Sequence, residues 1–252
     1  MTTSANTLPL AGKVAFVTGG SRGIGAAIVR RLAADGATVV FSYAASQGPA
    51  DELVRSVEAA GGRAQAVRID SADAAALSAG IDKAAADFGR LDILVNSAGV
   101  LALGTVDQFS LEDFDRTLAV NVRAVFVATK AATAHMKDGG RVINIGSTNA
   151  GRMPFAGGGV YAMSKSALVG LVQGLARDLG PRGITINNVQ PGPVNTDMNP
   201  ENGPSAGLMQ SFMAIQRHGQ PEEIAGMVSY LASPAAAFVT GASLAIDGGF
   251  AA

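Results

Sequence analysis

The sequence predicts an α/β protein in which helices cover both faces of a doubly wound, mostly parallel sheet of about seven strands. Short runs rich in β-branched residues alternate with longer segments of helical periodicity, as repeated β-α-β units require. The strand segments are almost continuously apolar, which is typical of strands buried on both faces. The 32 glycines are spread along the chain, which favours many tight turns between strands and helices. We find no linker or internal repeat, and we expect a single domain over residues 1–252.

Each predicted element has its own local signature. The first strand, at 13–19, ends in a glycine turn, and the helix at 23–36 ends at Gly36, a residue type preferred after a helix C-terminus. The helix at 49–62 has Pro49 near its start and glycines at its end, as helix ends favour. Apolar, β-branched runs predict the other strands at 37–43, 63–70, 91–99, 140–147, 183–192 and 243–249. Longer helical patterns predict the other helices after Asp73 and at 111–136, 161–179 and 221–233.

Residues 195–217 break the alternation and predict a substrate-binding lid. The segment includes the polar, turn-rich NPENGP and then the apolar LMQSFMAI, and a long irregular insertion after a strand is a common form of lid. Its large apolar side chains are Met198, Leu208, Met209, Phe212 and Met213. They favour an apolar, adaptable pocket, or alternatively they pack the lid onto the protein. Arg152 and Arg217 are the only basic candidates for contacting an anionic substrate.

Composition argues against several classes of protein. The formal net charge of −1 disfavours a nucleic-acid-binding protein, because such proteins carry a clear basic excess. The chain has no cysteine, and His135 and His218 are far apart without metal-binding spacing, so we expect no metal site. The N-terminal residues 1–13 lack the features of a secretory signal, and no apolar run is long enough to span a bilayer. We therefore expect a cytoplasmic protein with neither a membrane nor a nucleic-acid partner.

The segment VTGGSRGIG, between the first strand and the first helix, predicts a phosphate-binding turn. Gly19, Gly23 and Gly25 allow a tight turn and a close approach of the backbone to a ligand. The helix N-terminus that follows offers N–H groups and the positive end of the helix dipole, which suit a pyrophosphate. The spacing G-x-x-x-G-x-G differs from the common G-x-G-x-x-G fingerprint. The turn could merely connect two elements, but its position after the first strand favours a dinucleotide site.

The residues around this turn favour NADP(H) over NAD(H). An NAD site usually has an acidic residue at the end of the second strand, where it binds the ribose 2′-hydroxyl. Ser42 occupies that place in the sequence, with no carboxylate near it, and Arg22 lies inside the glycine turn. An arginine there could pair with a 2′-phosphate, unless it simply faces solvent.

Tyr161 and Lys165, in the segment GGGVYAMSKSAL, are spaced to share one face of a helix. A phenol titrates near pH ~10 and is a poor proton donor or acceptor at neutral pH. A cation beside it would lower that pKa, so the pair is a candidate acid/base. The alternative is an exposed helix with a solvated lysine and a tyrosine packed on the surface.

Several motifs occur together in the order found in short-chain dehydrogenases/reductases, and the chain resembles that family over essentially its full length. TGGSRGIG matches the family's TGxxxGxG turn, and NSAG resembles its NNAG motif with serine in place of the second asparagine. Asn121 stands where the family has a helix asparagine, and Ser147, Tyr161 and Lys165 match its serine and YxxxK motif. QPGPVNTDM resembles the family's PG segment after the sixth strand. The resemblance implies a Rossmann domain and favours the acid/base interpretation of the tyrosine and lysine.

The resemblance implies a role for each of four catalytic residues. Tyr161 would be the general acid in ketone reduction and the base in alcohol oxidation. Lys165 would lower the tyrosine pKa and bind the nicotinamide ribose. Ser147 would hydrogen-bond the substrate oxygen as negative charge develops there, and Asn121, through its backbone and a water, would link Lys165 to a proton path. The hydride would pass from the nicotinamide.

The resemblance also implies a set of cofactor-binding residues. Asp70 resembles the family's adenine-contacting aspartate, or alternatively caps a turn or helix. Asn96 mostly stabilises the central sheet in the family. Val194 and Thr196 match positions that contact the nicotinamide amide, although Thr196 could instead form a local turn. The complete predicted set is Gly19, Ser21, Arg22, Gly23, Ile24, Gly25, Ser42, Asp70, Asn96, Ala98, Gly99, Tyr161, Lys165, Pro191, Gly192, Val194 and Thr196.

Together these features predict an NADP(H)-dependent oxidoreductase that interconverts a ketone or aldehyde and an alcohol. A competing hypothesis comes from the segment NPENGP…SFMAIQRHGQPEE, which is similar to that of a bacterial subgroup of this fold described as cyclic-di-GMP-binding biofilm-dispersal proteins. Such a role would not require Tyr161. The presence of all four catalytic-type residues favours the enzyme.

The resemblance further implies a homotetramer, the common assembly in the family at this length. The helix at 161–179 is apolar over more than one face, and its small residues would let helices approach closely. These small residues are Ala167, Gly170 and Gly174. We expect charges on the outer face of this helix, at Leu168 or Val172, to break the assembly and destabilise the subunit.

Overall fold

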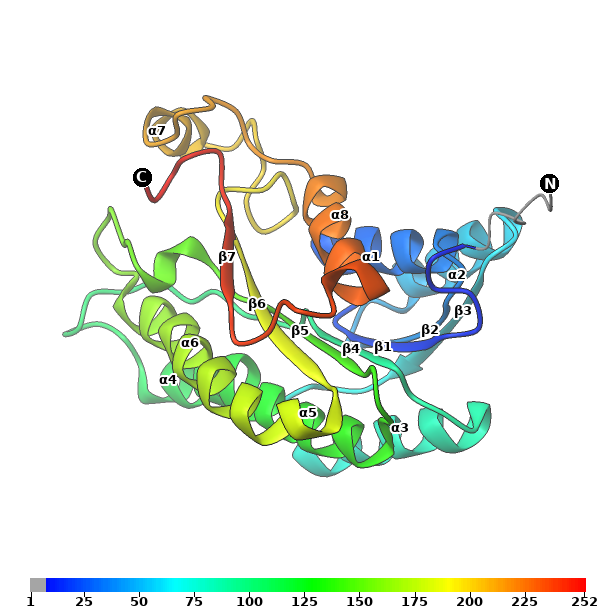
Figure 1. The fold of residues 1–252 in the computed structure, drawn as a ribbon. Helices are drawn as coiled ribbons and strands as arrows, with labels where there is room; N and C mark the ends of the chain where they lie inside the picture. Colours follow the sequence, from blue (N-terminus) through cyan, green and yellow to red (C-terminus); the bar gives the residue numbers. More distant parts are fainter. Residues whose placement is uncertain (1–7) are drawn as a thin grey trace.

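The computed structural model describes residues 8–252 and contains one seven-stranded sheet with helices on both faces (Figure 1). The strands are β1 Val14–Thr18, β2 Thr38–Tyr43, β3 Arg63–Arg68, β4 Ile93–Asn96, β5 Arg141–Ile145, β6 Thr185–Pro191 and β7 Ser243–Ile246. They lie in the order β3-β2-β1-β4-β5-β6-β7, and every neighbouring pair is parallel. The predicted fold class is confirmed. The expectations for the N-terminal segment and for a domain starting at residue 1 extend to residues 1–7, which lie outside the described part of the chain.

The helices form two layers, one on each face of the sheet, with the exception of the short helix at 206–211. They are α1 Gly23–Ala34, α2 Gln47–Ala59, α3 Ala74–Phe88, α4 Leu111–Leu118, α5 Ala124–His135, α6 Gly159–Leu179, α7 Ala206–Ser211 and α8 Pro221–Ala232. One cluster of buried apolar side chains joins the sheet to α1, α2 and α8, and a second joins it to α3, α5 and α6 (Figure 1). Among residues 8–252, no helix has the length and apolar character needed to cross a membrane.

The burial of each strand follows from its place in the sheet. β1, β4 and β5 are buried at every position, which explains their continuous apolar runs. The edge strands β3 and β7 contain exposed and partly buried positions instead. The chain adds β2 and β3 on one side of β1 and then crosses to β4 on the other side. Such a reversal creates a crevice beyond the carboxyl ends of the strands, where ligands bind in sheets of this type.

The single helix predicted at 111–136 is interrupted in the structure. α4 and α5 are joined by a π-helical turn at Ala119–Arg123, in which the N–H of Ala124 donates to the carbonyl of Ala119. A π turn adds one residue to a helical turn and is frequent at functional sites. Asn121 lies inside this turn. The apolar pattern continues through the interruption, so the pattern alone does not reveal it.

The segment predicted as a lid, 195–217, contains the short helix α7, which lies beside the C-terminal end of the chain (Figure 1). The N–H of Ile215 donates to the carbonyl of Gly248 at 2.8 Å. The lid is therefore tied to the C-terminal tail as well as to the strand that precedes it.

The expectation that Leu168 and Val172 lie on the outer face of α6 is wrong. Their side chains are 1% and 0% exposed, respectively, and pack against the body of the subunit. The outer face instead contains Ala167, Gly170 and Gly174, which are exposed. An added Cβ at either glycine would meet nothing within 4 Å. Because residues around a helix are spaced about 100° apart, the small residues and the large apolar ones lie on different faces.

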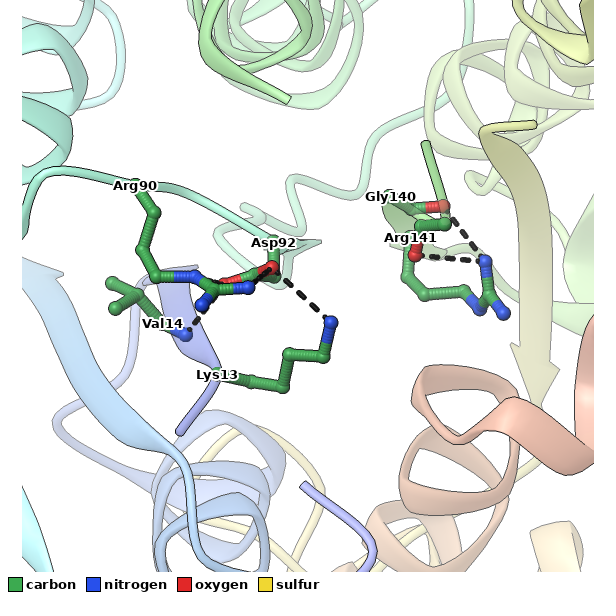
Figure 2. A network of polar contacts seen from close by, with 7 residues as sticks. Lys13, Val14, Arg90, Asp92, Gly140 and Arg141 are labelled. Atoms are coloured by element: carbon green, nitrogen blue, oxygen red, sulfur yellow. Dashed lines mark hydrogen bonds and ion pairs between the residues drawn. The ribbon is translucent and has the colours of Figure 1, made fainter. Parts of the chain in front are cut away.

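Asp92 holds together the amino-terminal edge of the sheet, opposite the crevice. Its carboxylate accepts hydrogen bonds from the N–H of Val14 at 2.9 Å and from Arg90 at 2.6 and 2.8 Å, and it pairs with Nζ of Lys13 at 3.4 Å (Figure 2). Burial alone would raise the pKa of Asp92, but these hydrogen bonds and positive charges outweigh burial and hold the pKa below its ordinary value. The ionised carboxylate therefore stabilises the folded protein.

Asp92→Asn is expected to lower the free energy of unfolding by about 1–3 kcal/mol at neutral pH, because the charged acceptor of several hydrogen bonds is lost. The pKa of Asp92 is lower in the folded than in the unfolded protein. Its contribution is therefore present above the unfolded pKa of about 4 and is lost as the pH falls through the folded pKa. Urea unfolding of wild type and variant at neutral and acidic pH measures both effects.

Asp87→Asn is the matched control for this prediction. It removes the carboxylate of the exposed i,i+4 pair with Lys83 and should change the free energy of unfolding by less than about 0.5 kcal/mol. Equal effects of the two substitutions would contradict the role given to Asp92.

Candidate active site

A cavity of about 930 Å³ opens at the carboxyl ends of the strands. It extends from the glycine turn after β1, past the ends of β2, β4 and β5, to the lid after β6. The predicted catalytic and cofactor-binding residues line it, with the exception of Asn96 and Asn121. Lining residues that the sequence analysis did not select include Tyr43, Ala44, Ser46, Ser71 and Arg116.

The turn between β1 and α1 depends on its glycines. Gly19 has φ +65° and Gly23 has φ +50°, a left-handed conformation that glycine adopts without strain. A Cβ on Gly19 would lie 2.8 Å from the Cα of Ala98, and one on Gly25 would lie 2.2 Å from the carbonyl oxygen of Gly19. Arg22, the residue before α1, makes no side-chain hydrogen bond to the first turn of the helix. The turn thus presents close-packed backbone and the N-terminus of α1 to an anion in the cavity.

Ser42 lines the cavity at a buried position, and its hydroxyl supports the glycine turn. The residue is 0% exposed, and its Oγ accepts a hydrogen bond from the N–H of Gly19 at 3.2 Å. Tyr43, the last residue of β2, is partly exposed, and Ala44 after it is exposed. Both line the cavity. Because successive side chains of a strand point to opposite faces, Tyr43 rather than Ser42 occupies the position suited to contacting a ribose.

Arg22 and the segment after β6 meet across the cavity. Nη1 of Arg22 lies 3.4 Å from Oδ2 of Asp197, and both side chains are largely exposed. Thr196 also approaches the turn, since a Cβ on Gly23 would lie 3.2 Å from its Cγ2. Arg22 thus lines the cavity and faces Asp197, while 59% of its side chain remains exposed. An exposed ion pair of this kind stabilises a protein by only ~0–1 kcal/mol, so it leaves Arg22 able to exchange partners.

Asp70 caps the turn after β3 and also lines the cavity, where contact with an adenine stays a prediction. Its carboxylate accepts two hydrogen bonds from Arg116 of α4, at 3.0 and 3.1 Å. It also accepts one from the N–H of Ala72 at 3.0 Å, which caps the turn after β3. The hydrogen bond with Arg116, followed by that with Ala72, holds the pKa of Asp70 below its ordinary value. Asp70 and Arg116 both line the cavity.

Asn96 belongs to the sheet rather than to the cavity wall. It is 3% exposed, and its Nδ2 donates to Oδ1 of Asn144 on the neighbouring strand β5 at 2.9 Å. This is the sheet-stabilising role that the family resemblance implies, so we remove Asn96 from the cofactor-contacting set. The next two N–H groups, of Ser97 and Ala98, donate to Oγ1 of Thr18 at 3.0 and 3.1 Å. These bonds fix the end of β4 beside the end of β1.

Ser147, Tyr161 and Lys165 come together in the cavity. Ser147 follows β5, whereas Tyr161 and Lys165 lie one turn apart on α6. Lys165 is 5% exposed, its Nζ donates to the carbonyl of Ile145 at 2.9 Å, and Nζ lies 5.8 Å from the centre of the Tyr161 ring. The side chain of Tyr161 is hydrogen-bonded to that of Ser147. An exposed helix with a solvated lysine is therefore excluded.

Burial controls the protonation of both α6 groups. It raises the pKa of the Tyr161 phenol, and the hydrogen bond with Ser147 opposes that rise only in part. Burial also lowers the pKa of Lys165 to about 8. The pKa of the tyrosine is thus raised by burial in this structure, whereas the sequence led us to expect that Lys165 would lower it. Tyr161 is consequently protonated at neutral pH and is placed to donate a proton.

Asn121 connects two walls of the site through its side chain. Its Oδ1 accepts from the N–H of Val100 at 2.9 Å, and its Nδ2 donates to the carbonyl of Val100 at 2.9 Å and to Oγ of Ser164 at 3.0 Å. Val100 follows the NSAG segment, and Ser164 precedes Lys165 on α6. The side chain of Asn121 therefore positions these two segments relative to each other, which makes it a positioning residue.

The lid is held to the C-terminal tail by a cluster of two aromatic rings and one arginine. The guanidinium of Arg152 donates to the carbonyl of Phe250 and lies 5.9 Å from the ring centre of Phe212 and 5.5 Å from that of Phe250. The two rings meet edge to face, with their centres 6.1 Å apart. The positively charged guanidinium is attracted to the electron-rich faces of the two rings.

The five apolar lid residues divide between the two roles predicted for them. Met198, Leu208 and Met209 line the cavity. Phe212 belongs to the aromatic cluster, and Met213 is 5% exposed, so these two pack the lid onto the protein.

Comparison with known proteins identifies relatives along nearly the whole chain. Residues 19–251 match the family model described as enoyl-(acyl carrier protein) reductase. A short-chain dehydrogenase/reductase from Serratia marcescens BCRC 10948 is 63% identical, with a TM-score of 0.96 over 97% of this chain and 100% of that one. A short-chain dehydrogenase from Burkholderia cenocepacia J2315, in complex with NADP, is 52% identical, with a TM-score of 0.95 over 97% of this chain and 100% of that one. The cyclic-di-GMP-binding biofilm dispersal mediator protein of Escherichia coli (strain K12) is 52% identical over 96% of this chain and 98% of its own.

These matches agree with the features described above. They include the seven-stranded parallel sheet, the glycine turn after its first strand, and a cavity that contains a serine together with the tyrosine and lysine of a YxxxK motif. The chain belongs to the short-chain dehydrogenase/reductase family of oxidoreductases.

Proposed function

We propose that this protein is an NADP(H)-dependent oxidoreductase that interconverts a ketone or aldehyde and an alcohol, with Tyr161 as the acid and base. The observation that carries the proposal is the presence of Tyr161, Lys165 and Ser147 in the same cavity as the glycine turn. The relative that is 52% identical and whose structure contains NADP supports the choice of cofactor.

The residues of the cavity fit a phosphorylated dinucleotide. The close packing of Gly19 and Gly25 brings backbone amides and the N-terminus of α1 to the cavity, which suits a pyrophosphate. Arg22 supplies a cation for the 2′-phosphate, and residues 42–46 contain no carboxylate that would repel it. Val194 and Thr196 line the cavity beside the lid, where we place the nicotinamide amide. The bound cofactor supplies or accepts the hydride.

The protein's own groups manage the proton and the charge. In the direction of reduction, Tyr161 donates its hydroxyl proton to the carbonyl oxygen while the carbonyl carbon receives the hydride. Ser147 donates a hydrogen bond to the same oxygen and stabilises its developing negative charge. The ammonium of Lys165 stabilises the phenolate that remains and binds the ribose. In oxidation the phenolate removes the proton from the alcohol. A water on the backbone carbonyl of Asn121 would link Lys165 to solvent.

Tyr161→Phe is expected to leave NADPH binding nearly unchanged while turnover of a ketone falls by about 10²–10⁴-fold, because the proton donor is lost. Fluorescence titration with NADPH and steady-state oxidation of NADPH with a ketone panel measure the two effects. Tyr230→Phe is the matched control, since Tyr230 lies outside the cavity and is 46% exposed. Turnover by Tyr161→Phe at the level of this control would refute the mechanism.

The cofactor assignment makes a separate prediction. Arg22→Ala should raise the KM for NADPH more than that for NADH. Tyr43→Asp should shift the preference toward NADH, because a carboxylate at the end of β2 repels a 2′-phosphate and accepts a hydrogen bond from a 2′-hydroxyl. Ser42→Asp, in contrast to Tyr43→Asp, should lower the stability of the folded protein, because it places a carboxylate at a buried position. The readout is kcat/KM with each cofactor, and a wild-type preference for NADH would show that Arg22 has been misassigned.

Binding of cyclic-di-GMP is a second candidate function, supported by the Escherichia coli relative. Arg22 and Arg116 line the cavity and could pair with the two phosphodiesters. Each already faces a carboxylate, however, from Asp197 and Asp70, respectively, and such binding gives Tyr161 no role. Titration of the NADPH complex with cyclic-di-GMP decides the matter, because a shared site requires that the cyclic dinucleotide displace NADPH.

We also propose a homotetramer in which the exposed, small-residue face of α6 packs against another copy. Ala167→Arg should then reduce the assembly to a smaller species, because the long side chain would separate the two helices, while the subunit itself stays folded. Light scattering at micromolar concentration, with circular dichroism to monitor folding, provides the test. A stable, active wild-type monomer of 25.3 kDa would refute the proposal.

A further inference from the structure

Several large apolar side chains remain exposed where the loop after β4 faces the lid. Leu101 and Leu103 of that loop are 39% and 56% exposed, respectively. Met198 and Leu208 of the lid are 57% and 53% exposed. All four line the cavity that contains Ser147 and Tyr161.

The grouping of these side chains around one cavity indicates a binding site, whereas the exposure of each one separately does not. Single exposed apolar residues are ordinary on protein surfaces. Here they come from three separate segments, the loop after β4, the loop after β6 and α7, and they surround one cavity. A concave apolar surface of this kind is typical of a site for an apolar ligand.

The two arginines considered for anionic substrates are both committed elsewhere. The guanidinium of Arg152 donates to the carbonyl of Phe250 and stacks on Phe212 and Phe250, and Arg152 is not part of the cavity wall. Arg217 forms a two-point ion pair with Glu223, at 2.7 and 2.8 Å. Neither offers a guanidinium to a carboxylate in the cavity.

Each cation that does line the cavity has a partner within the protein, and Arg22 is in addition the cation proposed for the 2′-phosphate of the cofactor. Arg22 faces Asp197, and Arg116 faces Asp70. Lys165 is buried, and its Nζ donates to a backbone carbonyl beside Tyr161. The charged residue next to Met198 in the chain is Asp197, a carboxylate that also lines the cavity. Within residues 8–252, the charge at the edge of the apolar part of the cavity is therefore the ion pair of Arg22 and Asp197. In the proposed NADPH complex Arg22 turns to the 2′-phosphate, which leaves the carboxylate of Asp197 there without a cation.

We infer that the substrate is an uncharged, apolar ketone or aldehyde, and that the site discriminates against carbonyl compounds bearing a carboxylate or phosphate. The inference rests on the proposed function and specifies the substrate class of the same site. A neutral chain is stabilised by covering the exposed leucine and methionine side chains. An anionic chain would lose hydration against the same side chains and meet the carboxylate of Asp197 without a compensating cation.

A matched pair of ketones tests this inference directly. Levulinate and ethyl levulinate have the same ketone, separated from the carboxylate or ester by two methylene groups, so their intrinsic reactivities are nearly equal. We expect kcat/KM with NADPH to be at least about tenfold higher for the ester, the factor that one unfavourable charge contact at a protein surface produces. Equal kcat/KM values for acid and ester would overturn the inference and leave the proposed function intact.

A substitution at the cavity wall reverses the preference if the inference is correct. Leu103→Lys should raise kcat/KM for levulinate relative to that for the ester by several-fold. Val106→Lys is the matched control, because Val106 lies on the same loop, is 98% exposed and does not line this cavity. It should leave the ratio unchanged. An unaltered ratio in Leu103→Lys would count against the inference.

Calorimetric titration of the NADPH complex with the two ketones gives a reading that does not need turnover. Tighter binding of the ester supports the substrate class. Equal or tighter binding of the acid overturns it. Absence of turnover with every carbonyl of the panel, together with tighter binding of the ester, would contradict the proposed function alone.

Discussion

The buried ammonium group of Lys165 is the constraint around which the rest of the site is organised. A charged group removed from water is strongly unfavourable unless hydrogen bonds replace its hydration. Nζ donates to the carbonyl of Ile145 at the end of β5 at 2.9 Å. Gly99, in the turn after β4, lies beside it, since an added Cβ on Gly99 would be in van der Waals contact with Nζ at 3.5 Å. The end of β5 and α6 are thus fixed relative to each other by one lysine.

The same arrangement determines the properties of Tyr161. Burial that lowers the pKa of Lys165 to about 8 also raises the pKa of the tyrosine. Tyr161 therefore holds its proton at neutral pH, beside a lysine that can stabilise the phenolate once the proton has left. Asn121 extends this organisation, because its hydrogen bonds to Val100 and Ser164 join the turn after β4 to the turn of α6 that precedes Lys165. The positions of the catalytic side chains therefore depend on how the turn after β4 and α6 are held together.

Much of the fold and site could be predicted from the sequence because the residues that specify them follow local or periodic patterns. Continuous apolar runs identified the buried strands, and the spacing of Tyr161 and Lys165 placed both on one helical face. Other features depend on tertiary contacts. Ser42 and Tyr43 are adjacent and both line the cavity, but Ser42 is fully buried against the glycine turn whereas Tyr43 is partly exposed. Leu168 and Val172 are apolar whether they face the core or a neighbouring subunit, so the sequence pattern could not distinguish the two. The pairing of Arg22 with Asp197 joins residues far apart in the chain.

Hydride transfer from NADPH to a carbonyl carbon is tested most directly by following the transferred hydrogen. A neutral ketone would be incubated with NADPH in which both hydrogens of the reactive ring carbon are replaced by deuterium, and the alcohol product analysed by mass spectrometry and proton NMR. The proposed mechanism predicts one deuterium on the carbinol carbon, while the hydroxyl proton comes from Tyr161 and ultimately from solvent. An alcohol without deuterium at that carbon, or no cofactor oxidation with any neutral carbonyl despite NADPH binding, would contradict it.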